Sequence, residues 1–285
     1  MSDKSSEIKL IPYLFNGKTL TFDKPLVMAI VNITPDSFYD GSKYAEAADV
    51  LKDVEEKVLQ EADILDVGAA SSRPGAALLS VDEEWLRLGE ILPVMRKTFP
   101  EKIISVDTYH AEIAKRAADA GVDMINDISG GTLDEAMVDM VCALNIPYVM
   151  MHMDGNPQTM QQNPTYENVI DAVQVKFEKQ ISVFKARGFN KLILDPGFGF
   201  GKSLQNNYEL LKGIGHFRSL GFPVLAGVSR KSMINKVIHS NPVTALNGTT
   251  VLNTIALLNG ASILRVHDVV EAKQAITLVE YYQNA

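Results

Sequence analysis

The chain has 285 residues, of which 35 are acidic and 27 are basic, so its formal net charge is -8 at pH 7. This balance argues against a nucleic-acid-binding surface, because binding to phosphates over an extended surface needs clustered Lys and Arg. The hydrophobic fraction of 46% is typical of a globular protein and too high for a disordered one. No apolar run approaches the roughly 20 residues of a membrane span. The amino-terminal residues have no secretory pattern. A single cysteine excludes an intrachain disulfide. We therefore expect a cytoplasmic protein.

Eight short apolar runs rich in β-branched residues predict β-strands, and their nearly continuous apolar character indicates burial on both faces. The runs are residues 26–32, 64–69, 103–108, 124–129, 147–152, 191–196, 223–229 and 262–267. Amphipathic patterns that follow the strands predict helices at 45–61, 82–98, 111–120, 134–144, 166–187, 204–211, 244–258 and 270–282. A capping box formed by Ser80 and Glu83 marks the start of the second of these helices.

Eight β-then-α units predict a parallel sheet. Eight such units also form a closed (β/α)₈ TIM barrel, an α/β fold whose usual size is about 250 residues. A doubly wound open sheet is the alternative. Residues 9–22 contain an Asn16-Gly17 turn between apolar stretches, which predicts a β-hairpin. We expect one domain over residues 1–285, with residues 1–25 forming a hairpin plug under the barrel.

Most of the predicted strands end in a polar side chain that favours neither packing nor strand formation. These residues are Asn32, Asp107, Asn126, His152, Asp195, Ser229 and His267. In a (β/α)₈ barrel the carboxyl ends of the strands ring one mouth, and active sites lie there. Any one of these residues is readily explained as a cap or turn residue, but the full set is not. Taken alone, His152 is expected to be a strand-end histidine whose hydrogen bonds are satisfied.

The residue types in this ring indicate what it binds. Carboxylates at Asp107 and Asp195, with the Asn126 amide, suit a flat heterocycle with an amidine-like edge, because a carboxylate accepts two parallel N–H bonds. An anionic group such as phosphate suits Arg265, His267 and the helix start after Ser229. The polar residues are too sparse for a metal cage, so Asn32 is a Mg²⁺ ligand only together with phosphate oxygens of a substrate.

The glycine-rich run over residues 196–203 does not match either common nucleotide-binding pattern. A Walker loop needs a glycine five residues before Gly201, where this chain has Pro196, and a dinucleotide fingerprint needs a glycine in place of Lys202. We interpret the run as a tight turn at the barrel mouth, where missing side chains allow a planar ligand to approach the backbone. Phe200 is a candidate to stack on such a ligand, and packing in the core is the equally open alternative for it.

Several stretches resemble those of dihydropteroate synthases, in the same order over about residues 26–280. They are MAIVNITPDSFYDG (28–41), DVGAASSRPGA (66–76), SVDTYH (105–110), INDISGG (125–131), LILDPGFGFGKS (192–203), AGVSRKSMI (226–234) and LRVHDV (264–269). The resemblance implies a (β/α)₈ barrel and a folate-pathway reaction. In that reaction, 4-aminobenzoate displaces diphosphate from (7,8-dihydropterin-6-yl)methyl diphosphate and gives 7,8-dihydropteroate.

The resemblance also assigns roles by position. It places the pterin against Asp107, Asn126, Asp195, Phe200, Gly227 and Lys231. It assigns Asn32, Arg265 and His267 to the diphosphate, with Asn32 as the Mg²⁺ ligand. It assigns Phe38, Ser71, Ser72, Arg73, Pro74, Lys231 and Ser232 to aminobenzoate, whose pocket sulfonamides occupy in this family. The expected catalytic set is Asp107, Asp195, Lys231, Arg265 and His267. The resemblance further implies a homodimer formed through late helices.

Two departures from the family pattern lie in the second loop. Many members have Gly-Glu or Gly-Val where this chain has Ala69-Ala70, and Thr where it has Ser72. Ser72 keeps a hydroxyl and hence its hydrogen bond. The alanines affect the shape of the loop and inhibitor affinity, but not the reaction class.

Two other functional classes are open. A pterin-dependent corrinoid methyltransferase shares the barrel and the pterin pocket, but it has no use for a loop such as SSRPG (71–75). A pterin-binding protein without activity does not need Asn32, Arg265 and His267. For the synthase, the economical route is dissociative: C–O cleavage precedes capture of the pterin-stabilised cation by the neutral arylamine, so no strong general base is required. Release of diphosphate that depends on aminobenzoate distinguishes the synthase from both alternatives.

Overall fold

The computed structural model describes residues 9–33, 43–69, 79–155 and 166–285, and its central feature is a parallel β-barrel. The strands are β3 (Leu26–Asn32), β4 (Ile64–Gly68), β5 (Ile103–Asp107), β6 (Met124–Asp127), β7 (Tyr148–Met151), β8 (Leu192–Asp195), β9 (Leu225–Ala226) and β10 (Ile263–Val266). Their order in the sheet is β8-β7-β6-β5-β4-β3-β10-β9. The seam between β8 and β9 is bridged where the Leu194 N–H donates to the Pro223 carbonyl at 2.9 Å. The predicted (β/α)₈ barrel is therefore confirmed, and the open-sheet alternative is wrong.

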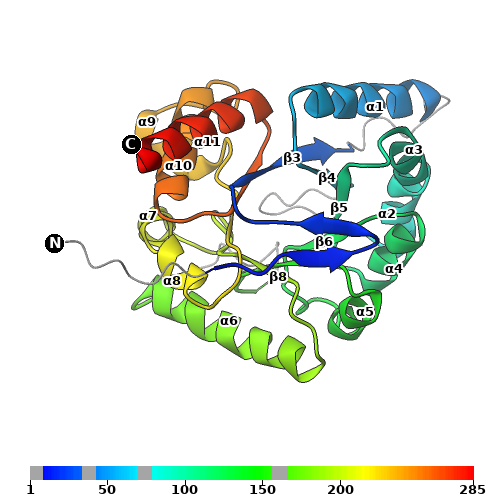
Figure 1. The fold of residues 1–285 in the computed structure, drawn as a ribbon, viewed down its shortest axis with the longest axis horizontal. Helices are drawn as coiled ribbons and strands as arrows, with labels where there is room; N and C mark the ends of the chain where they lie inside the picture. The colour runs from blue at the N-terminus through cyan, green and yellow to red at the C-terminus, as the bar shows by residue number, and fades with distance from the viewer. Residues whose placement is uncertain (1–8, 34–42, 70–78, 156–165) are drawn as a thin grey trace.

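A ring of helices surrounds the strands (Figure 1), which explains why the strands are apolar on both faces. The helices are α1 (Lys43–Leu59), α2 (Val81–Leu88), α3 (Ile91–Thr98), α4 (Ala111–Asp119), α5 (Met137–Leu144), α6 (Val169–Ala186), α7 (Leu204–Lys212), α8 (Ile214–Arg218), α9 (Ser232–Ile238), α10 (Leu246–Leu258) and α11 (Val269–Asn284). None of the helices in the described ranges is both long and apolar enough to cross a membrane.

The helix predicted over residues 82–98 is two helices, α2 and α3, because Pro93 has no N–H to donate to the carbonyl of Gly89. The predicted capping box opens α2: Ser80 Oγ accepts the Glu83 N–H at 3.3 Å, and the Glu83 carboxylate accepts the Ser80 N–H at 2.9 Å. The short helices α8 and α9 were not among the predicted ones, since one or two turns carry little periodic signal.

The predicted amino-terminal hairpin consists of β1 (Tyr13–Phe15) and β2 (Lys18–Leu20). Its turn residues, Asn16 at φ 47° and Gly17 at φ 72°, are both left-handed, as the tight hairpin turn requires. The Tyr13 hydroxyl donates to the carbonyl of Leu192 at the start of β8, at 2.5 Å. Lys18 Nζ donates to the Lys102 carbonyl, just before β5, at 3.0 Å. The hairpin, drawn in dark blue in Figure 1, therefore lies at the amino-terminal ends of the strands.

Candidate active site

Charged side chains from three strands meet inside the barrel. Arg265 of β10 donates from Nε to Asp66 Oδ2 of β4 at 2.7 Å, and from Nη2 to Asp107 Oδ2 of β5 at 2.8 Å. In the sheet order, β3 separates β10 from β4, and β4 in turn separates β3 from β5. Hydrogen bonds between strands that are not neighbours must cross the interior, so these side chains point into the barrel.

Asp66 is a member of this cluster that the sequence reasoning missed. It is fully buried, and its Oδ2 also accepts a hydrogen bond from Nδ2 of Asn126 in β6 at 2.9 Å. Its Oδ1 is buried without a hydrogen-bond partner among the described residues. The sequence does carry a signal for Asp66, because a carboxylate inside an apolar strand is costly unless it is paired. The prediction used only the polar residues at strand ends, whereas Asp66 lies within its strand.

Burial and the repulsion of neighbouring carboxylates make Asp107 a weak acid. Burial raises the pKa of Asp107 to about 7; Arg265 opposes this shift, and the neighbouring Asp66 carboxylate adds to it. Burial alone would lower the pKa of Arg265, but Asp66 and Asp107 outweigh burial and raise it. Arg265 is therefore permanently charged, while Asp107 exchanges its proton near neutral pH.

A glycine-rich loop follows Asp195 at the end of β8 and shapes the opposite wall of the mouth. Asp195 Oδ1 accepts the Gly197 N–H at 2.7 Å, and its Oδ2 has no hydrogen-bond partner in the part of the chain that the structure describes. Gly197 has a φ of +70°, and a Cβ there would lie 2.0 Å from the carbonyl oxygen of His152. Lys202 is buried and donates from Nζ to the carbonyls of His152, Gly197 and Phe200 at 3.2, 2.9 and 2.8 Å. These contacts form the tight turn that the run was predicted to make.

Lys231 brings a second cation to the mouth. It immediately precedes α9, and its Nζ donates to the Phe198 carbonyl at 2.5 Å. Burial lowers the pKa of Lys231 to about 8, and Asp195 opposes the shift. Burial also raises the pKa of Asp195, and Lys231 in turn opposes that shift. The two groups therefore stabilise each other's charged forms near neutral pH.

Phe200 and Gly227 complete the surroundings of Lys231. The Lys231 ammonium lies 4.9 Å from the centroid of the Phe200 ring. Phe200 packs in a small apolar cluster with Tyr109, Ile128, Met151 and Met153. A Cβ on Gly227 would lie 3.8 Å from Lys231 Nζ and 3.9 Å from Arg265 Cβ, so a larger side chain would project between the two cations.

His267 lies two residues beyond Arg265, directly after β10, and is held by Ser229. Ser229 Oγ accepts the His267 N–H at 3.3 Å and lies 2.9 Å from Nδ1 of the same residue. Ser229 Oγ and Nδ1 share one hydrogen bond, and a hydroxyl can serve as its donor or its acceptor. Burial lowers the pKa of His267 to about 4, and Arg265 adds to this shift. His267 is therefore a neutral imidazole at physiological pH.

Arg230 fixes the turn between Ser229 and Lys231. Its φ of 56° is unusual for a residue with a side chain. The backbone N–H donates to Thr249 Oγ1 at 3.0 Å, and the guanidinium forms two bonds to the Asp268 carboxylate, at 3.0 and 2.6 Å. Such a backbone conformation persists where neighbouring contacts hold it, and it is common at functional sites.

The sequence profile of the family described as pterin binding enzyme matches residues 28–267. The chain belongs to the pterin-binding enzyme family. A dihydropteroate synthase of Escherichia coli K12 is 40% identical over 266 residues, which cover 93% of this chain and 94% of that relative. The structure of Yersinia pestis dihydropteroate synthase in a sulfonamide drug complex superposes with a TM-score of 0.90 at 35% identity, covering 96% of this chain and 100% of the other. The Xanthomonas albilineans dihydropteroate synthase with 4-aminobenzoic acid gives a TM-score of 0.89 at 34% identity, with 97% and 100% covered.

The structure of this pterin-binding enzyme brings Asp107, Asn126, Asp195, Lys231 and Arg265 together at the mouth. Asn32 is exposed at the end of β3, between β10 and β4. Ser232 is exposed as the first residue of α9. The predicted residues Phe38, Ser71, Ser72, Arg73 and Pro74 lie outside the described residues, as does Ala70. Ala69 is buried, and its carbonyl accepts a hydrogen bond from Arg87 Nη1 at 2.7 Å.

The expectation for His152 is wrong in two respects. Its ring lies edge-on to Phe177 of α6, with centroids 6.5 Å apart, so it faces the helix layer and not the mouth. Neither ring nitrogen has a hydrogen-bond partner in the described ranges, so the histidine is not satisfied. A polar residue after a strand does not reveal which side of the barrel wall it faces, because both sides are buried.

Proposed function

We infer that this pterin-binding enzyme catalyses the dihydropteroate synthase reaction, which joins 4-aminobenzoate to the dihydropterin-methyl group and releases diphosphate. The observation that carries the inference is the inward cluster of Arg265, Asp66, Asp107 and Asn126 at the mouth of a barrel that matches synthases over nearly the whole of both chains. The Xanthomonas relative was solved with 4-aminobenzoic acid, which supports this compound as the second substrate. The relatives compared are synthases, so the methyltransferase alternative has no support.

We propose that the pterin lies between the Asp66–Asp107–Asn126 side of the mouth and the glycine-rich loop. Asp66 Oδ1 and Asp195 Oδ2 lack hydrogen-bond partners among the described residues, and both are acceptors suited to the N–H groups of a pterin. Lys231 supplies a cationic donor for the carbonyl side of the ring. Phe200 forms an apolar wall, and Gly227 leaves the space open.

The diphosphate is assigned to Arg265, His267 and Asn32. Arg265 contributes a fixed positive charge, and His267 contributes a neutral imidazole. In the dissociative route, the C–O bond breaks and its electron pair leaves with the diphosphate. The arylamine nitrogen then forms the new C–N bond and loses a proton to solvent. Arg265 and His267 act by stabilising negative charge that develops on the leaving oxygen.

A Mg²⁺ ion bound with the diphosphate is part of the proposal, with Asn32 as its protein ligand. No group of three or more His, Cys, Asp or Glu side chains in the described ranges is placed to hold a metal ion. A single amide oxygen from Asn32 fits a cation that takes most of its ligands from phosphate oxygens and water, as Mg²⁺ commonly does. When bound, the ion supplies charge neutralisation for the leaving group.

For the aminobenzoate site we propose Ser232 beside Lys231, together with Phe38 and the Ser71–Pro74 segment. Ser232 is exposed next to the half-buried Lys231, and its hydroxyl is suited to one carboxylate oxygen of aminobenzoate. The Yersinia relative was solved in complex with a sulfonamide drug. We propose that sulfonamides compete with aminobenzoate at this site too.

A homodimer and a cytoplasmic location complete the proposal. Large apolar side chains are exposed on α9, α10 and α11, which lie together in the upper left of Figure 1. They are Val237, Ile238, Val251, Leu258, Val270, Leu278, Tyr281 and Tyr282. An exposed apolar surface of this kind suits a two-fold contact between copies. The single cysteine supports the location. Sedimentation equilibrium tests the dimer, which Tyr281→Lys should weaken.

The deciding experiment incubates the purified protein with the pterin diphosphate, Mg²⁺ and 4-aminobenzoate and measures dihydropteroate by mass spectrometry. Product is expected only in the complete mixture, with one diphosphate released per dihydropteroate formed. Omission of aminobenzoate is the control for simple hydrolysis of the pterin diphosphate. Pterin binding without product would contradict the proposed reaction.

A further inference from the structure

Lys202 is a buried cation to which the proposed reaction gives no role. It is 5% exposed and directly follows the glycine-rich turn after β8. Its Nζ donates to the carbonyls of His152, Gly197 and Phe200 at 3.2, 2.9 and 2.8 Å, and it forms no ion pair with the residues that the structure describes. Burial of a charge without an ionic partner is costly, so these three hydrogen bonds are the contacts that offset the cost.

The segments that Lys202 joins lie on both sides of Asp195. The His152 N–H donates to the Asp195 carbonyl at 2.9 Å, and Asp195 Oδ1 accepts the Gly197 N–H at 2.7 Å. Asp195 Oδ2 has no hydrogen-bond partner in the described ranges and is the oxygen assigned to the pterin. Its position therefore depends on two segments whose carbonyls Lys202 holds together.

The approach of the turn to the end of β7 needs a donor between the carbonyls. All three carbonyl oxygens lie within 3.2 Å of Nζ, so their partial negative charges converge there and would be left unsatisfied without it. Gly197 has a φ of +70°, and a Cβ there would lie 2.0 Å from the His152 carbonyl oxygen. The Lys202 ammonium thus stabilises a close backbone contact in which three acceptors face one point.

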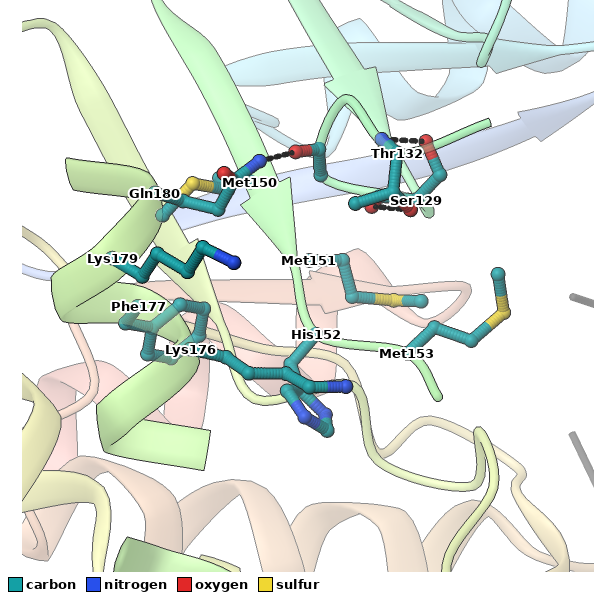
Figure 2. A pocket seen from close by; sticks show the side chains of 11 residues that line it. Ser129, Thr132, Met150, Met151, His152, Met153, Lys176, Phe177, Lys179 and Gln180 are labelled. Carbon is teal, nitrogen blue, oxygen red and sulfur yellow. Dashed lines mark hydrogen bonds between the residues drawn. The ribbon is translucent and has the colours of Figure 1, made fainter. Parts of the chain in front are cut away.

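The same turn places the ring of Phe200. The Phe200 carbonyl accepts the shortest of the three bonds, and its ring packs with Met151 and Met153. Figure 2 shows both methionines pointing away from α6, so Phe200 lies on the mouth side of β7. Its ring centroid is 4.9 Å from the Lys231 ammonium. Lys202 therefore also positions the apolar wall of the pterin site.

The number of donors on Lys202 depends on its protonation. An ammonium has three N–H donors for the three carbonyls, whereas a neutral amine has two and turns a lone pair toward the third. Burial lowers the pKa of Lys202 to about 7; Asp195 opposes the shift, and Lys231 and Lys176 add to it. The other ionisable groups around it are the His152 ring, which is neutral because burial lowers its pKa to about 2, and Tyr166 with Asp154 beside the Gly201 carbonyl.

We propose that Lys202 is a positioning residue for the pterin: its ammonium fixes the turn in the form that presents Asp195 Oδ2 and the Phe200 ring, and its neutral form does so less well. The inference rests on the pterin site proposed above and deepens it, because Lys202 acts on the pterin through the turn. Pterin affinity should therefore fall as Lys202 loses its proton.

The test compares pterin binding by the full-length protein and by Lys202→Met, which keeps the length of the side chain without its donors. The probe is 6-hydroxymethyl-7,8-dihydropterin, the pterin substrate without its diphosphate, and calorimetry measures its affinity. The wild-type protein is expected to bind roughly tenfold more tightly at about pH 6, as for the loss of a preorganised site.

The pH dependence of this affinity ratio distinguishes positioning by the ammonium from a merely structural role. Asp107, Lys231 and the pterin also titrate, but they are common to both proteins and cancel in the ratio. The ratio should fall toward about threefold at about pH 8.5, because the neutral amine keeps two of the three bonds. If Lys202→Met does not fold, Lys202→Gln takes its place, and the same decline of the ratio is expected.

Tyr13→Phe is the matched control for lost stability. It removes a buried donor from the opposite end of β8, where the Tyr13 hydroxyl bonds to the Leu192 carbonyl at 2.5 Å. Denaturant unfolding should show that this variant is less stable, and its pterin affinity should equal that of the wild-type protein.

Three outcomes would overturn the inference. They are equal pterin affinity of the wild-type protein and the Lys202 variant at about pH 6, an affinity ratio that does not change with pH, and an equal loss of affinity in Tyr13→Phe. Absence of pterin binding by the wild-type protein is a different result, because it would contradict the proposed function and the inference together.

Discussion

Replacing Asp66 by Asn should show whether Arg265 depends on the buried carboxylate that positions it. Asp66 Oδ2 accepts hydrogen bonds from Arg265 Nε at 2.7 Å and Asn126 Nδ2 at 2.9 Å. An amide of the same shape keeps one acceptor but removes the charge. The Asn126 contact becomes a neutral hydrogen bond, and the Arg265 contact keeps only one of its two charges; a bond with a charged group is worth about 1.5–3 kcal/mol and a neutral one about 1 kcal/mol. Asp107 still pairs with Arg265, so the larger cost of about 3–5 kcal/mol for an orphaned buried charge does not apply.

We therefore expect Asp66→Asn to lower the free energy of unfolding by about 2 kcal/mol. If the same energy orients Arg265 toward the transition state, kcat/KM should fall roughly thirtyfold. Denaturant unfolding measures the first quantity, and diphosphate release that depends on aminobenzoate measures the second. Asp127→Asn is the matched control. Asp127 is also fully buried, but it accepts hydrogen bonds from Ser129 and Tyr148 on the outer side of β6, so its loss should affect stability and spare the KM values.

A double-mutant cycle isolates the pair. Asp66→Asn and Arg265→Met should each destabilise the protein, and the double variant should be more stable than the sum of the two effects by about 2 kcal/mol. Strict additivity would refute the pairing argument. An unchanged kcat/KM in Asp66→Asn, at reduced stability, would show that the carboxylate is a structural residue only.

The other predictions concern the remaining charged groups. Asp195→Asn should weaken binding of the pterin substrate, because one of two acceptors becomes a misplaced donor; calorimetry that finds unchanged affinity would remove Asp195 from the pterin site. Arg265→Ala should slow single-turnover C–O cleavage roughly a hundredfold with a smaller effect on aminobenzoate binding, and an unchanged cleavage rate would contradict its leaving-group role. Burial raises the pKa of Glu84 in α2 from 4.5 to about 7, so the folded state holds this proton more tightly than the unfolded chain. Stability is therefore lost as pH rises from about 4.5 to 7, by up to about 3 kcal/mol. Glu84→Gln should flatten this part of the stability profile, whereas the exposed Glu135→Gln should not; equal profiles for both would refute the assignment.

The barrel could be predicted from the sequence because its signal is local and repeated. Each strand is an apolar run of a few residues, and eight runs separated by helical patterns leave few possible topologies. The helix over 82–98 was predicted as one because its apolar periodicity continues through Pro93, and only the missing N–H of that residue divides it.

The site could be predicted only in part, because strand ends are visible in a sequence and side-chain direction is not. In β6, the neighbours Asn126 and Asp127 are both buried, yet Asn126 bonds to Asp66 inside the barrel and Asp127 bonds to Tyr148 outside it. In a half-exposed strand, polarity would reveal this alternation, but in a strand buried on both faces it does not. The same limit explains the error at His152, whereas Asp66 was missed because it lies within its strand and not at the end.

The hairpin under the barrel has a consequence for how the chain is made. The hairpin is synthesised well before the partners of Tyr13 and Lys18: the Lys18 bonds to Lys102 and Asp123 span 84 and 105 residues, and the Tyr13 bond to Leu192 spans 179. Contacts between such distant segments form slowly, because a long loop must close first. The apolar faces of Tyr13, Phe15 and Leu20 therefore remain uncovered while roughly two thirds of the polypeptide is still being added. During that interval these uncovered apolar side chains make the nascent chain prone to aggregation and a candidate for chaperone binding.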